Sequence, residues 1–300
     1  MLDGRVAVVT GAGRGLGRAY ARALATAGAS VVVNDIDADV AAQTVRSIVD
    51  AGGAAVAETG PVGPAGTADA LVARAVSEYG RLDAMVTNAG ALRDRTLRNT
   101  TEEDFDLVVG SHLRGTFTCA RAAVVRFREQ GEGGRLILVG SPAGQRASFG
   151  QTTYSASKAA IVAMTRTWAA EYARIGVTAN AVIPTALTRM VATIPGLGEL
   201  VESADRGEPV PAHLRRQGLG TADDAAAVVV WLASAASGEV TGQAIATGGD
   251  RIALWTHPEI VAERLREGGW TADAVAEEFT GPLGKELCDH LPTPLDLEGP

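Results

Sequence analysis

The sequence contains few cysteines and histidines, two and four respectively. Its two cysteines, Cys119 and Cys288, lie far apart and lack the spacing of metal ligands. Cys119 falls in an apolar helical run, where we expect a buried thiol. This cysteine usage fits a reducing, cytoplasmic compartment. The sequence therefore predicts no metal centre.

The chain also lacks long apolar runs and a surplus of positive charge. No apolar run is long enough to span a bilayer, and no secretory signal precedes the first predicted strand, which begins at Arg5. The net charge of −8 argues against a nucleic-acid-binding surface. We therefore expect a cytoplasmic protein whose partners are neither membranes nor nucleic acids.

The overall composition is typical of a globular protein. The chain has 300 residues, of which 46% are hydrophobic and 21% charged, enough for one large α/β core. Thirty-six glycines indicate many tight turns, and no internal repeat is visible. We expect a single domain over residues 1–250.

A glycine-rich turn follows the first predicted strand. The strand, Arg5–Thr10, is a β-branched run, and Gly11-Ala-Gly-Arg-Gly-Leu-Gly17 leads from it into a helical run at Arg18. Glycines let the backbone approach a phosphate closely, and the helix start presents free N–H groups to it. The order of strand, glycines and helix therefore predicts a dinucleotide site. Its candidate residues are Gly11, Arg14, Gly15, Leu16 and Gly17.

The second predicted strand, Ser30–Asp35, ends in an acid at the position where a carboxylate meets the adenosine ribose. Asp35 can accept hydrogen bonds from both ribose hydroxyls and repels a 2′-phosphate, which favours NAD over NADP. Arg14 is counter-evidence, because a basic residue in this loop can pair with a 2′-phosphate. We weigh Asp35 more, so NADP is the less favoured cofactor.

A serine, a tyrosine and a lysine have a spacing that suits alcohol chemistry. Ser141 lies thirteen positions before Tyr154, and Lys158 follows Tyr154 by four, one turn along a predicted helix. A free tyrosine has a pKa of about 10, and a neighbouring ammonium lowers it. Such a tyrosine can take the proton of an alcohol while Ser141 holds the oxygen. The alternative is structural, with Tyr154 capping a helix and Lys158 solvated.

These motifs together resemble the short-chain dehydrogenase/reductase family, from about Gly4 to Gly249. The resemblance implies catalysis by Ser141, Tyr154 and Lys158, with Tyr154 and Lys158 also contacting an NAD(P) cofactor. It implies a doubly wound, mainly parallel, seven-stranded Rossmann-type α/β sheet. It also implies a homodimer or homotetramer, with helices around 105–128 and 154–174 forming a dimer face.

The same resemblance implies further cofactor contacts on other strand ends. Residues Asn88, Ala89 and Gly90 follow the predicted fourth strand and let the cofactor lie against the sheet edge. After the third strand the family's Asp-Val is replaced by Pro61-Val62, so only packing of Val62 on the adenine is expected. Beyond the sixth strand, the positions implied to face the nicotinamide or pyrophosphate are Pro184, Thr185 and Thr188.

His112 stands where the family has a catalytic asparagine that helps to hold a water next to the lysine. An imidazole can donate from one nitrogen and accept at the other, so His112 can replace the asparagine in a proton relay. It can also add a titration near neutrality. The alternative is a histidine satisfied by backbone at a helix interface.

Two segments carry the remaining expectations. Residues 185–220 should form a lid over the substrate. Residues 251–300 should form a helical extension, with helices at 257–266 and 271–279 and a loose tail at 291–300. An extension of this kind, and the HLRG segment at His112, resemble the dehydrogenase part of peroxisomal multifunctional enzyme type 2.

We therefore expect an oxidoreductase that interconverts a secondary alcohol and a ketone, on 3-hydroxyacyl-CoA or hydroxysteroid substrates. Two alternatives stay open. One is an NADPH-dependent reductase of the 3-oxoacyl-acyl carrier protein type, and the other is a non-catalytic dinucleotide sensor.

Overall fold

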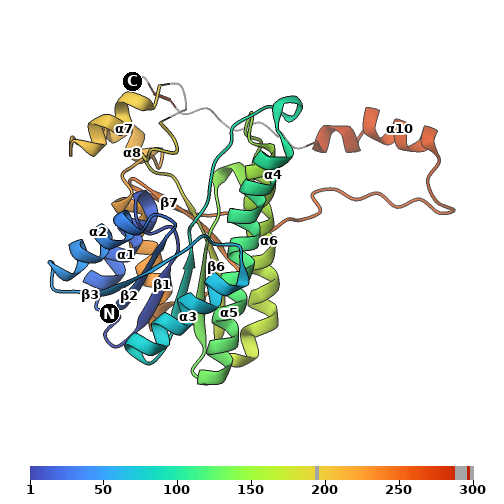
Figure 1. Ribbon diagram of the computed structural model, residues 1–300. Helices are drawn as coiled ribbons and strands as arrows, with labels where there is room; N and C mark the ends of the chain where they lie inside the picture. Colours follow the sequence, from blue (N-terminus) through green and yellow to red (C-terminus); the bar gives the residue numbers. More distant parts are fainter. Residues whose placement is uncertain (193–195, 288–295, 298–300) are drawn as a thin grey trace.

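One eight-stranded sheet forms the centre of the protein, with strand order β3-β2-β1-β4-β5-β6-β7-β8 (Figure 1). The computed structural model describes residues 1–192, 196–287, 296 and 297. Strands β1 to β7 run parallel, and β8 pairs with β7 in the antiparallel sense. The strands are β1 (Val6–Val9), β2 (Ser30–Asp35), β3 (Ala54–Thr59), β4 (Ala84–Thr87), β5 (Gly134–Val139), β6 (Val177–Pro184), β7 (Ala244–Gly248) and β8 (Arg251–Leu254).

Helices cover both faces of the sheet, which explains why the central strands are apolar without alternation. Every residue of β1 and β4 is buried. One core layer packs β1 and β2 against the helices α1, α2 and α9, and the opposite layer packs the sheet against α3, α5 and α6. The helices are α1 (Gly15–Thr26), α2 (Ala38–Val49), α3 (Ala65–Tyr79), α4 (Glu102–Val109), α5 (Gly115–Gln130), α6 (Thr152–Tyr172), α7 (Gly198–Asp205), α8 (Ala212–Arg216), α9 (Ala226–Ala233) and α10 (Ala272–Thr280).

The strand order reverses direction at β1, whose neighbours are β2 on one side and β4 on the other. The connections that follow β1 and β4 diverge at this point, which opens a crevice at the carboxyl ends of the strands. The predicted doubly wound, mainly parallel sheet is confirmed. The predicted count of seven strands is one too low, because Arg251–Leu254 turns back along β7 as an edge strand.

One helix prediction also needs correction. The helix over 105–128, for which the sequence indicates a break near Gly110, is confirmed as α4 and α5 on either side of a π-helical segment, Gly110–Arg114. The expected helix at 257–266 does not form, and residues 255–266 have no regular structure. The expected helix at 271–279 is confirmed as α10. Most of the expected tail at 291–300 lies outside the described residues.

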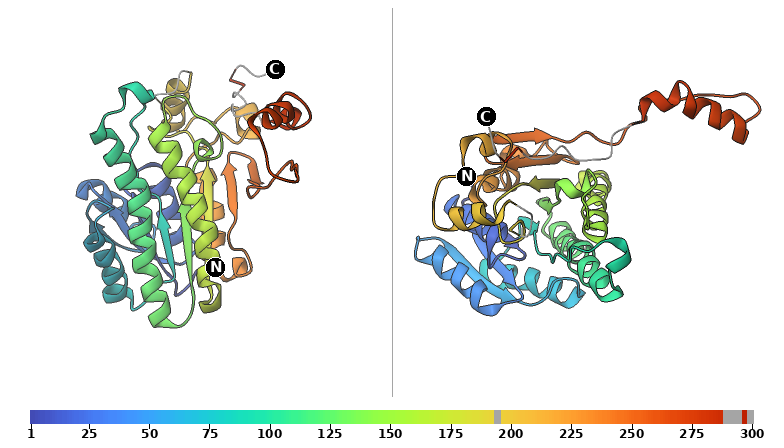
Figure 2. Two further views of the ribbon diagram at one scale, coloured as in Figure 1. Left: turned by 90° about the vertical axis from the view of Figure 1, so that its right-hand side faces the viewer. Right: turned by 90° about the horizontal axis from the view of Figure 1, so that it is seen from above.

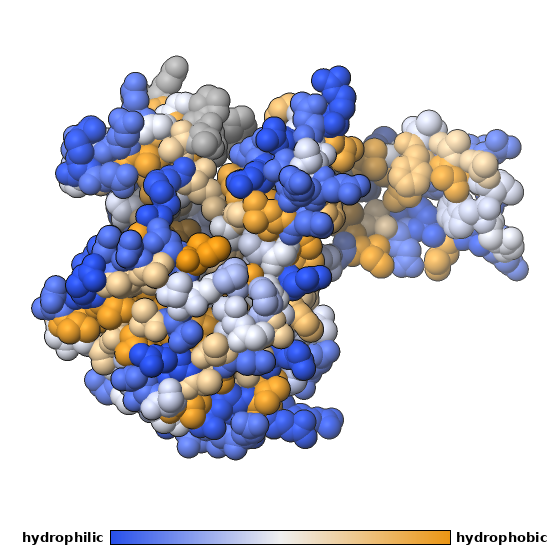
Figure 3. All heavy atoms as spheres, viewed as in Figure 1, coloured by the Kyte–Doolittle hydropathy of each residue, from blue (hydrophilic) through white to orange (hydrophobic). Residues whose placement is uncertain are grey.

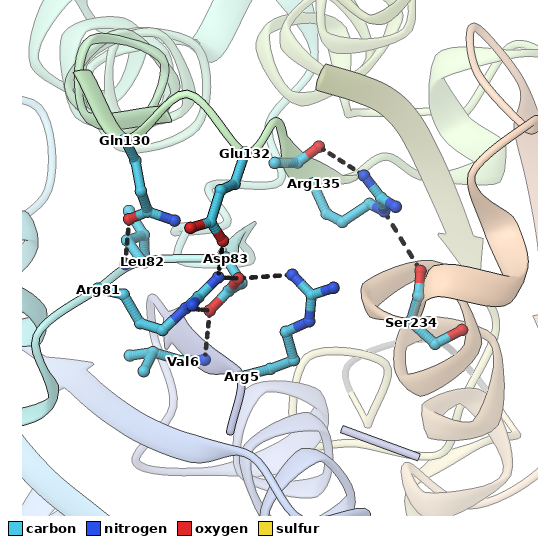
Figure 4. Close-up of polar contacts among 10 residues, drawn as sticks. Arg5, Val6, Arg81, Leu82, Asp83, Gln130, Glu132, Arg135 and Ser234 are labelled. Atoms are coloured by element: carbon cyan, nitrogen blue, oxygen red, sulfur yellow. Dashed lines mark hydrogen bonds and ion pairs between the residues drawn. The ribbon is translucent and has the colours of Figure 1, made fainter. Parts of the chain in front are cut away.

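An ion-pair network centred on the buried carboxylate of Asp83 ties the strands together at their amino ends, opposite the crevice (Figure 4). The carboxylate of Asp83, before β4, accepts hydrogen bonds from Arg5 at 2.7 Å, from Arg81 at 2.7 and 2.8 Å, and from the Val6 backbone N–H at 2.9 Å. Burial alone raises the pKa of Asp83, but the bonds from Arg81 and Arg5 outweigh it and hold the pKa below its usual range. Arg81 also pairs with Glu132 at 2.7 Å, so the network joins β1, β4 and the end of α5.

The segments around the sheet differ in how they are packed. Helices α7 and α8, within the predicted lid at 185–220, share a small apolar cluster that includes Leu197, Val201 and Leu214. Helix α10 lies well away from the sheet and its helix layers, at the end of an extended segment (Figures 1 and 2).

Candidate active site

The glycine turn after β1 depends on close backbone contacts. Gly11 has φ +61°, and a Cβ at this position would lie 2.7 Å from the Cα of Ala89. A Cβ on Gly17 would collide with the Gly11 carbonyl oxygen and with Asn88. Glycine is therefore required at both positions for the first turn of α1 to lie against the loop that follows β4.

Thr10 and Asn88 hold this turn in place. The Thr10 hydroxyl accepts hydrogen bonds from the backbone N–H groups of Asn88 at 3.0 Å and Ala89 at 3.1 Å. The Asn88 side chain donates to the carbonyl oxygens of Thr10 at 3.0 Å and Gly11 at 3.1 Å. Asn88 thus braces the glycine turn with its amide. Thr10 was missed by the sequence analysis, although a hydroxyl at the end of β1 was a visible signal.

A cavity of about 850 Å³ opens above the glycine turn. Helix α1 starts at its floor, and the N-cap residue Arg14 makes no side-chain capping hydrogen bond. The first N–H groups of a helix have no partner within it, so this helix end offers donors and a positive dipole to a phosphate. The residues that line the cavity include Gly13, Gly15, Leu16, Gly17, Arg18, Asn88, Gly90, Thr188 and Arg189. The volume of the cavity, the glycines on its floor and the free N–H groups at the start of α1 all fit a bound dinucleotide.

Asp35 and Arg14 lie on the side of this turn that faces the end of β2. Asp35 accepts hydrogen bonds from the backbone N–H groups of Gly13 at 2.9 Å and Asp37 at 3.1 Å. A Cβ on Gly13 would lie 2.7 Å from an Asp35 carboxylate oxygen, so Gly13 leaves room for the carboxylate. Arg14 pairs with Asp37 at 3.2 Å. The positive charge of the loop is therefore partly neutralised by Asp37.

The remaining residues predicted to contact the cofactor lie in different places in the structure. Thr188 faces the glycine turn, since a Cβ on Gly15 would lie 3.8 Å from its methyl group. Pro184 pairs with Thr247 at the end of the sheet, and the Thr185 N–H donates to the Thr247 carbonyl at 2.9 Å. The Thr185 N–H is therefore used by the sheet. Val62 belongs to the apolar cluster under α5 rather than to the lining of the cavity.

Ser141, Tyr154 and Lys158 come together at the start of α6. Tyr154 lies in the first turn of this helix, and Lys158 lies in the next turn with its Nζ 5.6 Å from the centre of the tyrosine ring. Ser141 follows β5, and its hydroxyl lies close enough to Tyr154 to lower the tyrosine pKa. Lys158 is buried and donates to the carbonyl of Val139 at 2.6 Å. The sequence-predicted triad therefore forms one cluster.

The electrostatics of the triad differ from the expectation. Burial raises the pKa of Tyr154, the Ser141 hydrogen bond lowers it and the charge of Asp94 raises it, with a net rise. The expected lowering by Lys158 is therefore wrong for the structure. Burial also lowers the pKa of Lys158 to about 7, because the ammonium is desolvated and pairs with no carboxylate in the described part of the chain. Lys158 is thus the member of the cluster whose charge changes near neutrality.

His112 lies in the π-helical segment between α4 and α5 and is buried. Its Nε2 bonds to the Ala91 carbonyl at 2.8 Å, so Nε2 carries the proton and Nδ1 is the acceptor. Nδ1 is buried without a partner among the described residues. The ring meets Tyr154 edge-on, with 5.1 Å between centroids. Burial, followed by the charge of Lys158, lowers its pKa well below 6.5, so the expected titration near neutrality is wrong.

Glycines and one acid complete the surroundings of the cluster. A Cβ on Gly90 would collide with the His112 ring, so Gly90 joins the cavity to the catalytic cluster. A Cβ on Gly144 would lie 2.6 Å from the Lys158 carbonyl carbon. Asp94 accepts a hydrogen bond from Gln151 at 3.1 Å, which fixes its charge beside Tyr154. Sequence reasoning missed Gly144 and Asp94, since only tertiary contacts reveal them.

A family model described as enoyl-(acyl carrier protein) reductase matches residues 11–249. A crystal structure of a short-chain dehydrogenase from Mycobacterium avium superposes with a TM-score of 0.78 at 35% identity and covers 98% of both chains. The chain belongs to the short-chain dehydrogenase/reductase family. It is accordingly an oxidoreductase that uses a nicotinamide dinucleotide, NAD or NADP.

Among curated short-chain dehydrogenase relatives, hydroxyacyl-CoA dehydrogenase ChsB1 of Mycobacterium tuberculosis is 41% identical over 86% of this chain and 82% of its own length. The peroxisomal multifunctional enzyme type 2 of Drosophila melanogaster is 43% identical over 63% of this chain. This chain matches 32% of that longer enzyme. The short-chain reductase protein NovJ of Streptomyces niveus is 40% identical over 82% of this chain and 93% of its own length.

The described residues of this short-chain dehydrogenase lack two other features, a cluster of metal ligands and a membrane-spanning helix. Within the described residues, no group of three or more His, Cys, Asp or Glu side chains is placed to hold a metal ion. Nor does any helix in this part of the chain combine the length and apolar character that crossing a membrane requires.

Proposed function

We propose that this short-chain dehydrogenase uses NAD to interconvert the secondary alcohol of a 3-hydroxyacyl-CoA thioester and the corresponding 3-oxo thioester. The observation that carries the proposal is the cluster of Ser141, Tyr154 and Lys158, in which buried Lys158 lies one turn from Tyr154 along α6. The thioester is suggested by the name of the relative ChsB1, which aligns along most of its length. A hydroxysteroid is the second substrate class.

Two hydroxyl groups define where the substrate oxygen sits in this proposal. The Ser141 hydroxyl lies near enough to Tyr154 to influence its pKa, so an alcohol oxygen placed between the two hydroxyls meets one donor and one proton acceptor. Ser141 steadies the oxygen, and Tyr154 takes its proton in oxidation and returns it in reduction. The nicotinamide, when bound, accepts or supplies the hydride at the same carbon.

Lys158 and His112 serve the proton of Tyr154. A tyrosine whose pKa is raised by burial stays protonated at neutral pH, so it can accept the alcohol proton only as its own proton passes to another group. Lys158, with a pKa of about 7, can hold a proton or release it at neutral pH. The unpartnered Nδ1 of His112 is an acceptor beside the Tyr154 ring. We assign Nδ1 to orient a water that links Lys158 with solvent.

The preference for NAD is supported by the ends of β2 and the glycine turn. Asp35 carries a negative charge at the ribose position, and Asp37 draws Arg14 away from a 2′-phosphate. The Asp35→Ala protein should lose its preference for NAD over NADP at least tenfold in kcat/KM, since the repelling charge is removed. Asp39→Ala, a first-turn acid of α2, is the matched control and should keep the preference.

A substrate panel with both cofactors tests the function. The full-length protein is assayed by NADH or NADPH absorbance with 3-hydroxyacyl-CoAs, hydroxysteroids, simple alcohols, 3-oxoacyl thioesters and enoyl thioesters. Turnover of 3-hydroxyacyl-CoAs with NAD supports the proposal. A preference for NADPH with 3-oxoacyl-acyl carrier protein favours the reductase alternative. Nucleotide binding without turnover of any compound would leave the dinucleotide sensor.

We also propose that two or four copies associate through the α5–α6 face, as in the family. Phe117 and Val125 of α5 expose about half of their side-chain surface there, at 47% and 53%. The cytoplasmic compartment stays a prediction, because relatives include enzymes named as peroxisomal. The single domain over 1–250 and the lid over 185–220 stay predictions as well. Sedimentation of the full chain over a range of concentrations measures the association.

A further inference from the structure

Asp94 lies in the loop that joins β4 to α4, and this loop contacts the segment that leads into α6. The Arg95 N–H donates to the Gly150 carbonyl at 2.8 Å, so the backbones of the two segments are bridged. Gln151 donates from Nε2 to both carboxylate oxygens of Asp94, at 3.1 and 3.3 Å. The Gln151 Oε1 accepts from the Ser148 hydroxyl at 2.8 Å, which orients the amide. Asp94 is therefore held in a defined place beside the start of α6.

The carboxylate of Asp94 forms no ion pair within the part of the chain that the structure describes. The arginines on either side of it, Arg93 and Arg95, both turn to Asp104 of α4, at 3.5 and 2.7 Å. The rest of the first turn of α4 is acidic as well. Figure 3 shows hydrophilic residues gathered over α4 and the loop that precedes it. This side of the catalytic cluster therefore presents negative charge to an entering molecule.

The charge of Asp94 reaches the catalytic cluster. Burial is the main reason why the pKa of Tyr154 is raised, and the Asp94 carboxylate raises it further. His112 is neutral at neutral pH, because its pKa lies well below 6.5. Lys158, with a pKa of about 7, is protonated only in part under the same conditions. Negative charge therefore prevails where the substrate oxygen is proposed to bind.

We infer that Asp94 is a specificity-determining residue, which selects substrates that carry no negative charge next to the reacting carbon. A 3-hydroxyacyl thioester is neutral there, and its phosphates lie at the far end of a long arm. A free 3-hydroxy acid carries a carboxylate only one methylene away from the reacting carbon, so Asp94 repels it. The inference rests on the proposed function and deepens it, since it gives a reason for the use of a thioester in place of the free acid.

An exposed carboxylate should act through a moderate effect that depends on salt. Asp94 is exposed, so water and dissolved ions screen its charge. Repulsion by Asp94 is thus expected to weaken as the ionic strength rises, whereas a purely structural role of this residue would not respond in that way.

The ethyl ester and the free acid of 3-hydroxybutyrate measure this selection, because they differ mainly in charge at one end. The full-length protein is assayed with NAD at about pH 7.5, where the free acid is ionised. Asp94→Asn keeps an oxygen that can accept from Gln151 and removes the charge. The ratio of kcat/KM for the acid to kcat/KM for the ester should rise at least about fivefold. The ratio cancels any change in the basicity of Tyr154 that both substrates share.

Two variants and one change of solvent serve as controls. Asp94→Glu keeps the charge and should keep the wild-type ratio within about twofold. Asp106→Asn removes an exposed acid of α4 and should also leave the ratio unchanged. Raising sodium chloride from about 0.05 M to about 0.5 M should increase the wild-type ratio about threefold and leave that of Asp94→Asn unaltered.

The outcomes separate the role of Asp94 from the assignment of the substrate. An unchanged ratio in Asp94→Asn overturns the inference, and so does a wild-type ratio that is independent of salt. An equal rise in Asp106→Asn would assign the effect to the net charge of the protein and overturn it as well. Turnover of the ester without turnover of 3-hydroxybutyryl-CoA overturns the proposed substrate, while the ratio still tests Asp94. A protein that turns over none of the three compounds overturns both.

Discussion

Replacing Lys158 by methionine should make the protein more stable at neutral pH while it removes catalysis. Lys158 is buried, and its ammonium donates to the Val139 carbonyl but pairs with no carboxylate among the residues that the structure describes. Methionine has similar length and no charge, so it fills the same space without the cost of desolvation. Lys158 therefore lowers the free energy of unfolding, while the proposed reaction requires it.

The magnitude follows from the pKa. A fall from 10.5 to about 7 corresponds to at most about 5 kcal/mol, at 1.36 kcal/mol for each pKa unit. The variant leaves the Val139 carbonyl without its donor, which costs about 1–3 kcal/mol. The net gain in the free energy of unfolding should be about 2–4 kcal/mol, or roughly 3–6 °C in Tm for a chain of this size.

The pH dependence fixes the sign of this effect. The unfolded chain binds the lysine proton below pH 10.5, whereas the folded protein binds it only below about pH 7. The cost of burial is therefore fully present at pH 7 and below, and declines as the pH rises toward 10.5. The advantage of Lys158→Met should shrink steadily between pH 7 and pH 10.

Urea unfolding of the protein without added nucleotide measures both quantities. Wild type and Lys158→Met are compared at pH 7 and pH 10, and Lys285→Met, at an exposed lysine, is the control and should change little at either pH. A variant that is less stable than wild type at pH 7 would refute the reasoning. A gain that does not depend on pH would refute it as well.

Three further changes test other parts of the structure. Asp83→Asn leaves Arg5 and Arg81 without their shared carboxylate and should lower the free energy of unfolding by about 2–4 kcal/mol, measured by urea titration. A loss below about 0.5 kcal/mol would contradict a stabilising role of this ion-pair network. His112→Asn should keep kcat within about tenfold of wild type while His112→Ala falls further, since only asparagine can still orient a water; equal values would exclude the relay. Gly11→Ala should weaken NAD binding at least tenfold by calorimetry, because its Cβ meets Ala89, and unchanged affinity would disprove that packing.

The sheet was predictable because its strands and turns carry local signals. Buried parallel strands read as continuous apolar runs, and Gly11–Gly17 marks the first turn. The short edge strand Arg251–Leu254 lacks that signal, since most of its residues are exposed. The false helix at 257–266 shows that helical spacing of apolar residues does not suffice, because no surface of the same chain buries them.

The catalytic cluster was predictable in its members but not in its electrostatics. The spacing of Tyr154 and Lys158 places them on one face of a helix, whatever surrounds them. Their pKa values depend on burial, which comes from β5, β6 and the loop after Ser141 and cannot be read from spacing. The low pKa of His112 was unpredictable for the same reason, because its surroundings combine elements that are distant in sequence.

The central claim is that Tyr154 exchanges the proton of the substrate while other residues hold the dinucleotide. Tyr154→Phe removes one oxygen and leaves the aromatic ring that packs beside His112 and Lys158. Tyr172→Phe, at the end of the same helix, is the matched control and should keep turnover.

The most direct measurement is single-turnover NADH formation by Tyr154→Phe, together with its NAD affinity by calorimetry. The account predicts an NAD affinity within about threefold of wild type and a loss of at least about 1,000-fold in the rate of hydride transfer. A variant that binds NAD and turns over at the wild-type rate would contradict it.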